Sequence, residues 1–361
     1  MKTNLLKAVS KAAFLLSIGL TIVAVSCKNN TKESSSENAE SIEQTDSVPQ
    51  LESVLTLQEL SDKIRENPLD PDLFAQRSGY RAVNKEFNQA LGDIEIALKL
   101  DSLNPQYYVM QAEYFIYNGQ PSSAKKGLND CLSLFPKNTE VMLKIAEIHF
   151  YLKEYQQAQR MLQAVTTLDQ DIAQIYFLNG LIFLEKTDTA SALKNLQFST
   201  EKDPDFYSAF MMLGQIHNGM NSKMAIDYYR SAIDVIPESY EARYNLGMFY
   251  QGQEMIAEAE LEYNYIIYEI DSTSANPFYN LGYINLIYKG EYEKAIDFFT
   301  RAIQKNPEYV EAWYNRGFSY EVMGNLKLAR ENYTRSLQIQ TNYPLSIKGL
   351  NRLDNGKPFK F

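Results

Sequence analysis

The side chains in this sequence that could perform chemistry are few and far apart. The chain of 361 residues has two cysteines, Cys27 and Cys131, and two histidines, His149 and His217. Such residues could supply a thiolate nucleophile or a pair of metal ligands, but they are too few for a zinc cluster or a disulfide framework. The sequence has no HExxH helix, phosphate-binding loop, glycine-rich dinucleotide turn or GxSxG elbow. We therefore expect a protein that is not an enzyme and that binds no cofactor and no metal.

The charge balance restricts the class of partner. The chain has 45 acidic and 35 basic side chains, a formal net charge of −10, and three of its lysines lie in the first 26 residues. A protein that binds the phosphates of nucleic acid needs a basic surface. We therefore expect no nucleic-acid partner.

The first 26 residues have the pattern of a targeting segment. Lys2, Lys7 and Lys11 precede an apolar run over residues 12–25. As a helix this run would span about 21 Å, which is short of a bilayer core and typical of a signal peptide. The sequence Ala24-Val25-Ser26-Cys27 that follows it resembles a bacterial lipobox, in which the cysteine becomes the lipidated first residue. The alternative is ordinary signal-peptide cleavage, with Cys27 incidental.

The lipobox resemblance implies a signal peptide over 1–26, lipidation of Cys27 and contact with the membrane through the lipid anchor only. Because no Asp follows Cys27, the sorting rule for such proteins favours the outer membrane of the cell envelope, on its periplasmic or its surface face. Residues 27–55 are mostly polar and cannot bury enough apolar surface to fold. They predict a disordered tether between the anchor and the folded body.

The rest of the chain repeats one pattern with a period near 34 residues. An alanine recurs at intervals of 34, 34, 34, 33, 34, 36 and 34 residues: Ala90, Ala124, Ala158, Ala192, Ala225, Ala259, Ala295 and Ala329. About twelve residues before each alanine stands another small residue: Ser78, Ala112, Ala146, Gly180, Gly214, Gly247, Gly282 and Gly317. Small side chains in this phase allow two antiparallel helices to approach closely, and we expect the small residue of the first helix to face the alanine of the second. Asp70-Pro71, Asn104-Pro105, Asp203-Pro204 and Asn276-Pro277 predict helix starts.

Two copies of the pattern resemble the tetratricopeptide repeat especially well. They contain Ala312-Trp313-Tyr314-Asn315-Arg316-Gly317 and Tyr279-Asn280-Leu281-Gly282. The resemblance implies an all-α fold, a right-handed superhelical solenoid of eight helix-turn-helix units with terminal capping helices, over residues 56–354. The first copy departs from the pattern at Arg77-Ser78, and the seventh has an extra residue near Gly290 that we expect to shift its turn. The predicted repeats cover 71–104, 105–138, 139–172, 173–206, 207–239, 240–274, 275–309 and 310–343, with caps at 56–66 and 345–354 and a tail at 355–361.

This frame assigns packing roles to the reactive side chains. His149 and His217 occupy one phase of two repeats that are not adjacent, where other repeats have Phe or Tyr, so we expect them to pack and not to share a metal. Cys131 occupies a small position at a helix crossing, so we expect a buried thiol.

The resemblance implies that the first helices line the concave face of the solenoid and that partners bind there. The predicted partner-binding residues on this face are mainly aromatic: Tyr117, Phe150, Tyr151, Phe177, Tyr244, Asn245, Met248, Tyr279, Asn280, Tyr283, Tyr314, Asn315 and Phe318. The same exposed stripe is predicted to include Leu143, Leu181, Leu184, Met211 and Leu286. Glutamates are interspersed at Glu113, Glu147, Glu185, Glu241, Glu311 and Glu321. No Lys or Arg falls in this phase, which argues against the family's carboxylate clamp and favours an apolar or aromatic segment with basic flanks.

Two questions stay open at this stage. In the family, an asparagine like Asn245, Asn280 or Asn315 can hydrogen-bond the backbone of a bound peptide, but a local structural role is an equal alternative. The resemblance favours a membrane-anchored adaptor for a protein or peptide partner. The alternatives are a glycan-binding nutrient-uptake lipoprotein and an accessory subunit of an envelope enzyme or secretion complex.

Overall fold

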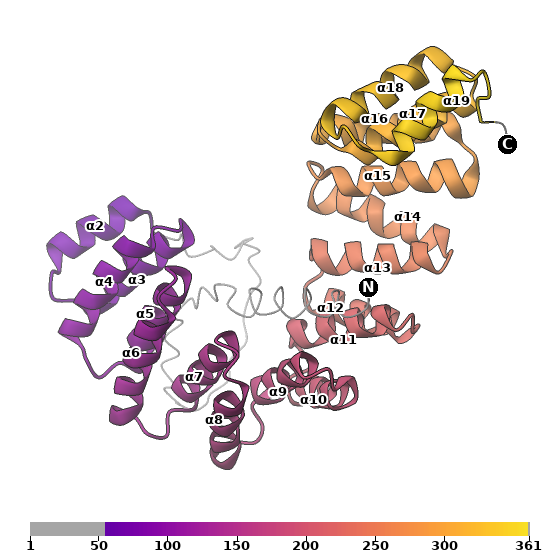
Figure 1. Ribbon diagram of the computed structural model, residues 1–361. Helices are drawn as coiled ribbons and strands as arrows, with labels where there is room; N and C mark the ends of the chain where they lie inside the picture. The colour runs from indigo at the N-terminus through magenta and orange to yellow at the C-terminus, as the bar shows by residue number, and fades with distance from the viewer. Residues whose placement is uncertain (1–54, 360–361) are drawn as a thin grey trace, which may run out of the picture. The chain divides into compact units, whose positions relative to one another are not determined.

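The computed structural model describes residues 55–359, and over this range the fold is all-α (Figure 1). These residues form 18 α-helices and two π-helical segments and no strand, which confirms the predicted fold class. Over residues 57–185 and 207–354, successive helices contact one another. None of these helices is long and apolar enough to cross a bilayer. The predicted signal peptide, the lipidation site Cys27 and most of the tether lie outside the described residues.

The chain divides into two compact units within the described range, one up to Asn195 and the other from Leu196. The helix α10 (Thr189–Lys202) contains the boundary. The helices of the first unit are α2 (Leu57–Glu66), α3 (Pro71–Val83), α4 (Phe87–Leu100), α5 (Pro105–Tyr117), α6 (Pro121–Leu134), α7 (Thr139–Tyr151), α8 (Tyr155–Leu168) and α9 (Ala173–Glu185).

The second unit continues the alternation of first and second helices. Its elements are α11 (Tyr207–Gly219), α12 (Met224–Val235), α13 (Tyr240–Gly252), α14 (Ile256–Tyr265), η1 (Ile266–Ile270), α15 (Ala275–Ile284), η2 (Asn285–Lys289), α16 (Tyr292–Lys305), α17 (Val310–Val322), α18 (Leu326–Ile339) and α19 (Pro344–Asp354). Each predicted repeat range therefore holds one helical pair.

The helix starts follow two of the four Asx-Pro signals. The side chains of Asp70 and Asn104 accept hydrogen bonds from the backbone N–H groups two residues ahead and so cap α3 and α5. The other two predictions are wrong. Asp203-Pro204 lies in the turn before α11, and Asn276-Pro277 lies inside α15, whose N-cap is Ser274.

The two helices of every repeat are joined by a turn with one left-handed residue. Positive φ angles recur once per repeat, at Lys85, Gly119, Lys153, Thr187, Asn221, Glu254, Gly290 and Gly324. Only three of these eight are glycines, so the sequence signals just three of the turns. The other five side chains adopt a conformation that costs energy for any residue with a Cβ atom.

The closest neighbour of the small residue at the crossing differs from the prediction. A Cβ atom built on Gly214, Gly247 or Gly282 would lie 2.6–2.8 Å from the nearest ring carbon of Tyr229, Tyr263 or Phe299, respectively. Each of these rings stands four residues after the repeat's alanine. The glycine therefore makes room for an aromatic ring, which is why its repeat cannot accept a larger residue at that position.

Two π-helical segments explain the one interval of 36 residues. In η1 the N–H of Asp271 donates to the carbonyl of Ile266 (2.7 Å), and in η2 the N–H of Gly290 donates to the carbonyl of Asn285. The wider turns hold the added residues inside the helices α14–η1 and α15–η2. The prediction of one extra residue near Gly290 therefore accounts for only one of the two added residues, because the other lies before α15.

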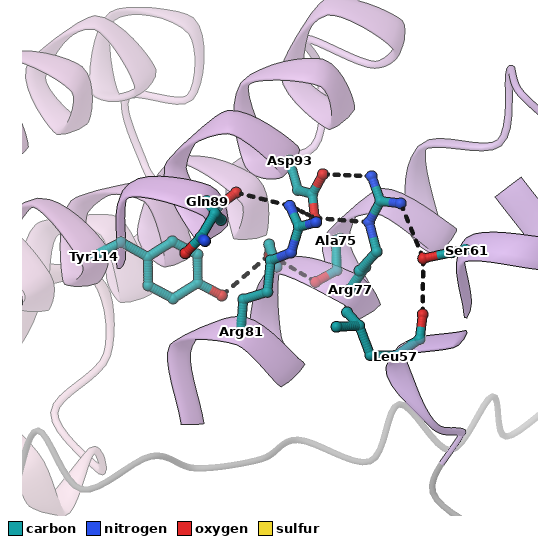
Figure 2. A network of polar contacts seen from close by, with 9 residues as sticks. Leu57, Ser61, Ala75, Arg77, Arg81, Gln89, Asp93 and Tyr114 are labelled. Carbon is teal, nitrogen blue, oxygen red and sulfur yellow. Dashed lines mark hydrogen bonds and ion pairs between the residues drawn. The ribbon is translucent and has the colours of Figure 1, made fainter. Parts of the chain in front are cut away.

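A buried ion pair accounts for the unusual first repeat (Figure 2). The guanidinium of Arg77 donates to both oxygens of Asp93, at 2.9 and 2.7 Å, and Arg81 lies 2.8 Å from the same carboxylate. Arg77 also donates to the hydroxyl of Ser61 on α2 (3.3 Å). Arg77 thus joins α2 to α4, so that α2 takes the place of a preceding second helix and covers the first repeat.

Candidate functional site

Three tyrosines occupy the same position on consecutive first helices of the second unit. Tyr244, Tyr279 and Tyr314 lie on α13, α15 and α17. Each ring packs against the aromatic ring of its own second helix, with centroid distances of 6.1 Å to Tyr263, 5.7 Å to Phe299 and 5.6 Å to Tyr333, in that order. The rings are therefore half-buried and fixed from below by the core of their repeats.

Hydrogen bonds between repeats join this row. The side-chain amide of Asn280 donates to the hydroxyl of Tyr244 (3.3 Å), and that of Asn315 donates to the hydroxyl of Tyr279 (3.0 Å). Asn280 and Asn315 are only 5% and 8% exposed. These two asparagines therefore have a structural role between repeats, and their predicted contact with a bound peptide stays a prediction. Asn245 is more exposed than Asn280 or Asn315. In the preceding repeat, Met211 takes the position that Tyr244 and Tyr279 occupy in theirs, so Asn245 has no tyrosine hydroxyl there to which it could donate.

A second row lies one helical turn further along the same helices. Met248 is 44% exposed, Tyr283 lies 6.5 Å from Tyr279 between ring centroids, and Phe318 stacks on Tyr314 at 6.2 Å. We call the two rows together the aromatic strip: Tyr244, Met248, Tyr279, Tyr283, Tyr314 and Phe318. The rings of the strip are partly exposed, and these contacts hold them in place before any partner arrives.

The four site residues predicted in the first unit do not form a comparable surface. Tyr117 stacks on Phe87 at 5.2 Å, Tyr151 is 46% exposed, and Phe150 and Phe177 are buried, the latter completely. The predicted exposure of Phe150 and Phe177 is therefore wrong. Helix α9, which contains Phe177, buries residues on all of its sides, as a helix that is apolar all round does. Also buried, against expectation, are Leu143, Leu181, Leu184, Met211 and Leu286.

Cations neutralise several of the predicted glutamates. Lys144 lies 2.9 Å from both Glu113 and Glu147. In the second unit, Arg352 of α19 donates to both oxygens of Glu321, at 2.9 and 2.7 Å. The expectation that no Lys or Arg lies beside these glutamates is therefore wrong. The prediction counted only the inward-facing positions of the first helices, and neither Lys144 nor Arg352 of the capping helix is at such a position.

Glu321 is the most enclosed charge beside the aromatic strip. Its side chain also accepts a hydrogen bond from the Tyr333 hydroxyl (2.5 Å) and another from the backbone N–H of Phe359 (2.7 Å). Burial by itself raises the pKa of this carboxyl, but the bonds from Arg352, Tyr333 and Phe359 outweigh it and hold the pKa below the usual value. Glu321 is thus a charged acceptor for main-chain N–H groups, a feature that the sequence did not indicate.

Of the reactive side chains in the described range, His217 and Cys131 have packing roles, whereas His149 forms a polar contact with Glu154. His217 stacks on Tyr228 at 5.2 Å, and burial lowers its pKa. His149 contacts Glu154 at 2.5 Å, and Cys131 is fully buried, with a pKa raised to about 11 by burial. Over residues 55–359 no three His, Cys, Asp or Glu side chains gather where they could hold a metal ion.

Comparisons with known proteins agree with this geometry. Family models described as tetratricopeptide or TPR repeats match residues 115–176, 285–324 and 310–343. Two curated relatives are the human Superkiller complex protein 3, 24% identical over 68% of this chain, and the Drosophila melanogaster BBSome complex member BBS4 homolog, 27% identical over 42%. The chain spans only 18% and 32% of their lengths.

A solved structure shows the same fold. It is the C-terminal part of a TPR repeat-containing protein from Cytophaga hutchinsonii, and the superposition has a TM-score of 0.57. The match covers 67% of this chain and 99% of that one, at 14% identity. This match shows the fold alone, and tetratricopeptide repeats themselves are detected within residues 115–176 and 285–343.

Proposed function

We propose that the chain is a non-enzymatic scaffold that binds a protein or peptide partner on the aromatic strip and that a lipid on Cys27 anchors it to the cell envelope. The observation that carries the proposal is the strip itself. Its rings are packed from below, and Asn280 and Asn315 fix two of the hydroxyls, so little side-chain entropy remains to be lost on binding. Aromatic side chains presented this way are the usual anchors of protein interfaces.

The surroundings of the strip favour a partner with an apolar or aromatic segment and basic flanks. Glu241 and Glu311 precede Tyr244 and Tyr314 by three residues, close to one helical turn on the same helices. The chain's net charge of −10 repels nucleic-acid phosphates, which supports a protein partner. The names of two relatives, the Superkiller complex protein and the BBSome complex member, also describe components of protein assemblies.

The proposed anchor rests on the sequence around Cys27. The short apolar run and the lipobox-like Ala24-Val25-Ser26-Cys27 support attachment by lipid, with the outer membrane as the proposed site. Replacing Cys27→Ser should move the protein from the membrane fraction to the soluble fraction of the cell envelope. If the variant stays in the membrane fraction, the anchor proposal is wrong.

The choice of residues for a binding test follows from the packing. Tyr279 and Tyr314 lie against Phe299 and Tyr333, so truncating them would damage the repeats. The double variant Met248→Glu with Tyr283→Glu instead places charge on the second row, where Met248 is exposed and Tyr283 is partly exposed.

A matched control is available on the second helix of the sixth repeat, the repeat that also contains Met248. Leu261→Glu with Tyr268→Glu places the same two charges on side chains of α14 and η1 that are exposed. Partners cross-linked to the intact protein in its own cells should be lost with the strip variant and kept with the control, while the helical content of both is unchanged. Retention of every partner by the folded strip variant would refute binding at the strip.

A further inference from the structure

The segment after α19 folds back onto the end of the aromatic strip. Gly356 has a left-handed φ of 64°, and the N–H groups of Gly356 and Lys357 donate to the carbonyls of Leu353 (3.2 Å) and Arg352 (2.9 Å). These two bonds close the end of the helix and reverse the chain direction. The reversal brings Phe359 to the first helix of the last repeat.

Phe359 occupies a defined seat there. Its ring meets Phe318 edge-on, with 5.1 Å between centroids, and its backbone N–H donates to Glu321 Oε1 (2.7 Å). The guanidinium of Arg352 lies 5.9 Å from the ring of Phe318 and 6.0 Å from that of Phe359. We call Phe318, Glu321 and Arg352 the Phe359 seat.

The seat combines two kinds of recognition. Phe318 and the Arg352 guanidinium offer an aromatic face and a cation to a ring. Glu321, which is 1% exposed, offers a carboxylate oxygen to a main-chain N–H. Arg352 and Tyr333 hold that carboxylate in place, so it is already oriented when an occupant arrives.

The segment itself shows which occupant fits. Residues 356–361 read Gly-Lys-Pro-Phe-Lys-Phe, with two lysines and no acid in a chain whose net charge is −10. Pro358 restricts the backbone before Phe359 to an extended form. An aromatic residue between basic ones therefore matches the partner chemistry that the strip favours.

We propose that the Phe359 seat is a recognition site for an aromatic residue in an extended, basic-flanked protein segment, and that the chain's own residues 356–361 compete for it. The proposal rests on the proposed function, because the seat is the end of the same strip. A segment tethered through a few residues has an effective concentration in the millimolar range. A partner must therefore displace Phe359, and its apparent affinity falls by the fraction of time for which the seat is free.

The test uses a fluorescent peptide of residues 355–361 and the full chain in detergent. Phe359→Ala in the protein empties the seat without changing Phe318, Glu321 or Arg352. By fluorescence anisotropy the peptide should bind this variant at least tenfold more tightly than wild type, if the segment fills the seat about 90% of the time. The same peptide with its own Phe359→Ala change should bind neither protein.

A seat variant supplies the second arm. Adding Phe318→Ala to the Phe359→Ala protein should abolish peptide binding, and Phe318→Leu, which keeps apolar volume, should weaken it. Circular dichroism verifies that both proteins remain folded. Equal binding to wild type and Phe359→Ala, no binding to either, or binding that survives Phe318→Ala in a folded protein would each overturn the proposal.

This result is separable from the partner test. Peptide binding uses no cellular partner, so the seat can be established even if cross-linked partners ignore the strip variant. If partners are lost with the strip variant while the peptide fails to bind, the scaffold proposal stands and the seat proposal falls.

Discussion

The close approach of Gly282 to Phe299 permits a quantitative test of how these repeats pack. A Cβ atom on Gly282 would lie 2.7 Å from two ring carbons of Phe299, which is about 1 Å inside the favourable contact distance. Overpacking of this kind costs about 1–3 kcal/mol, and the better helix propensity of alanine recovers roughly 1 kcal/mol. The net effect of Gly282→Ala should therefore be to lower the free energy of unfolding by up to about 2 kcal/mol.

A second substitution should relieve the clash. At the two positions that hold Gly282 and Phe299 in the seventh repeat, repeats two and three have alanine and leucine. These pairs are Ala112 with Leu128 and Ala146 with Leu162. Phe299→Leu alone should cost roughly 1–2 kcal/mol because it leaves a cavity. The double variant Gly282→Ala with Phe299→Leu should be more stable than the sum of the two single effects predicts, by about 1–2 kcal/mol.

The single tryptophan makes this measurement specific to the second unit. Trp313 lies on α17, so its fluorescence during urea unfolding follows the unit that contains Gly282. Gly252→Ala is the matched control, because nothing lies within 4 Å of a Cβ atom at that position. It should stabilise the unit by about 0.5 kcal/mol. The packing argument is refuted if Gly282→Ala stabilises the unit as Gly252→Ala does, or if the effects of Gly282→Ala and Phe299→Leu simply add.

Three further predictions follow from the turn between helices, the enclosed carboxylate and the buried thiol. Thr187 is exposed and has a φ of 62°, a left-handed conformation that costs about 1–2 kcal/mol for a residue with a Cβ atom. Thr187→Gly should therefore stabilise the chain by about 0.5–1 kcal/mol in thermal unfolding. A lower melting temperature would contradict this. Because the pKa of Glu321 is lowered in the folded chain, its stabilisation is complete above the usual carboxyl value of 4.5 and is lost as pH falls through the lower native value. The stability gap between wild type and Glu321→Gln, followed by Trp313 fluorescence, should therefore narrow between pH 5 and pH 3, and a constant gap would contradict the assignment. With Cys27→Ser in place, Cys131 should react with iodoacetamide at pH 8 at least about 100-fold more slowly in the folded chain than in urea, because burial raises the pKa of its thiol to about 11, and equal rates would contradict burial.

The fold could be predicted from the sequence because its small residues repeat with a fixed period. A buried alanine such as Ala295 leaves no room for a larger side chain, so the position is marked in every copy. The aromatic partner of each glycine was missed because a pattern of small residues shows that space is limited and not what limits it. The five turns without glycine were missed for a related reason, since residues such as Thr187 adopt a left-handed conformation only because the helices on both sides impose it.

The candidate site was harder to predict, because helical phase fixes where a side chain points and not what covers it. Phe177 and Tyr279 hold the same phase in their repeats, yet Phe177 is fully buried while Tyr279 is partly exposed. Whether such a ring is covered depends on the neighbouring helices, which lie at least a repeat away in sequence.

The same reasoning explains why the two rows of the strip differ in what they can contribute. The ring of Tyr279 packs against Phe299 and Tyr309, and its hydroxyl accepts a hydrogen bond from Asn315. Tyr279 therefore stabilises the packing between repeats and has less surface left for a partner. Phe318, one turn beyond Tyr314, is instead met by a residue from outside the repeats, Phe359. Phe318 also packs against the core cluster of Leu286, Ala295 and Phe299, but its outer contact is with Phe359, which under our proposal a partner's aromatic residue replaces. Variation of the second row should therefore change binding, whereas variation of the first row should mainly change stability.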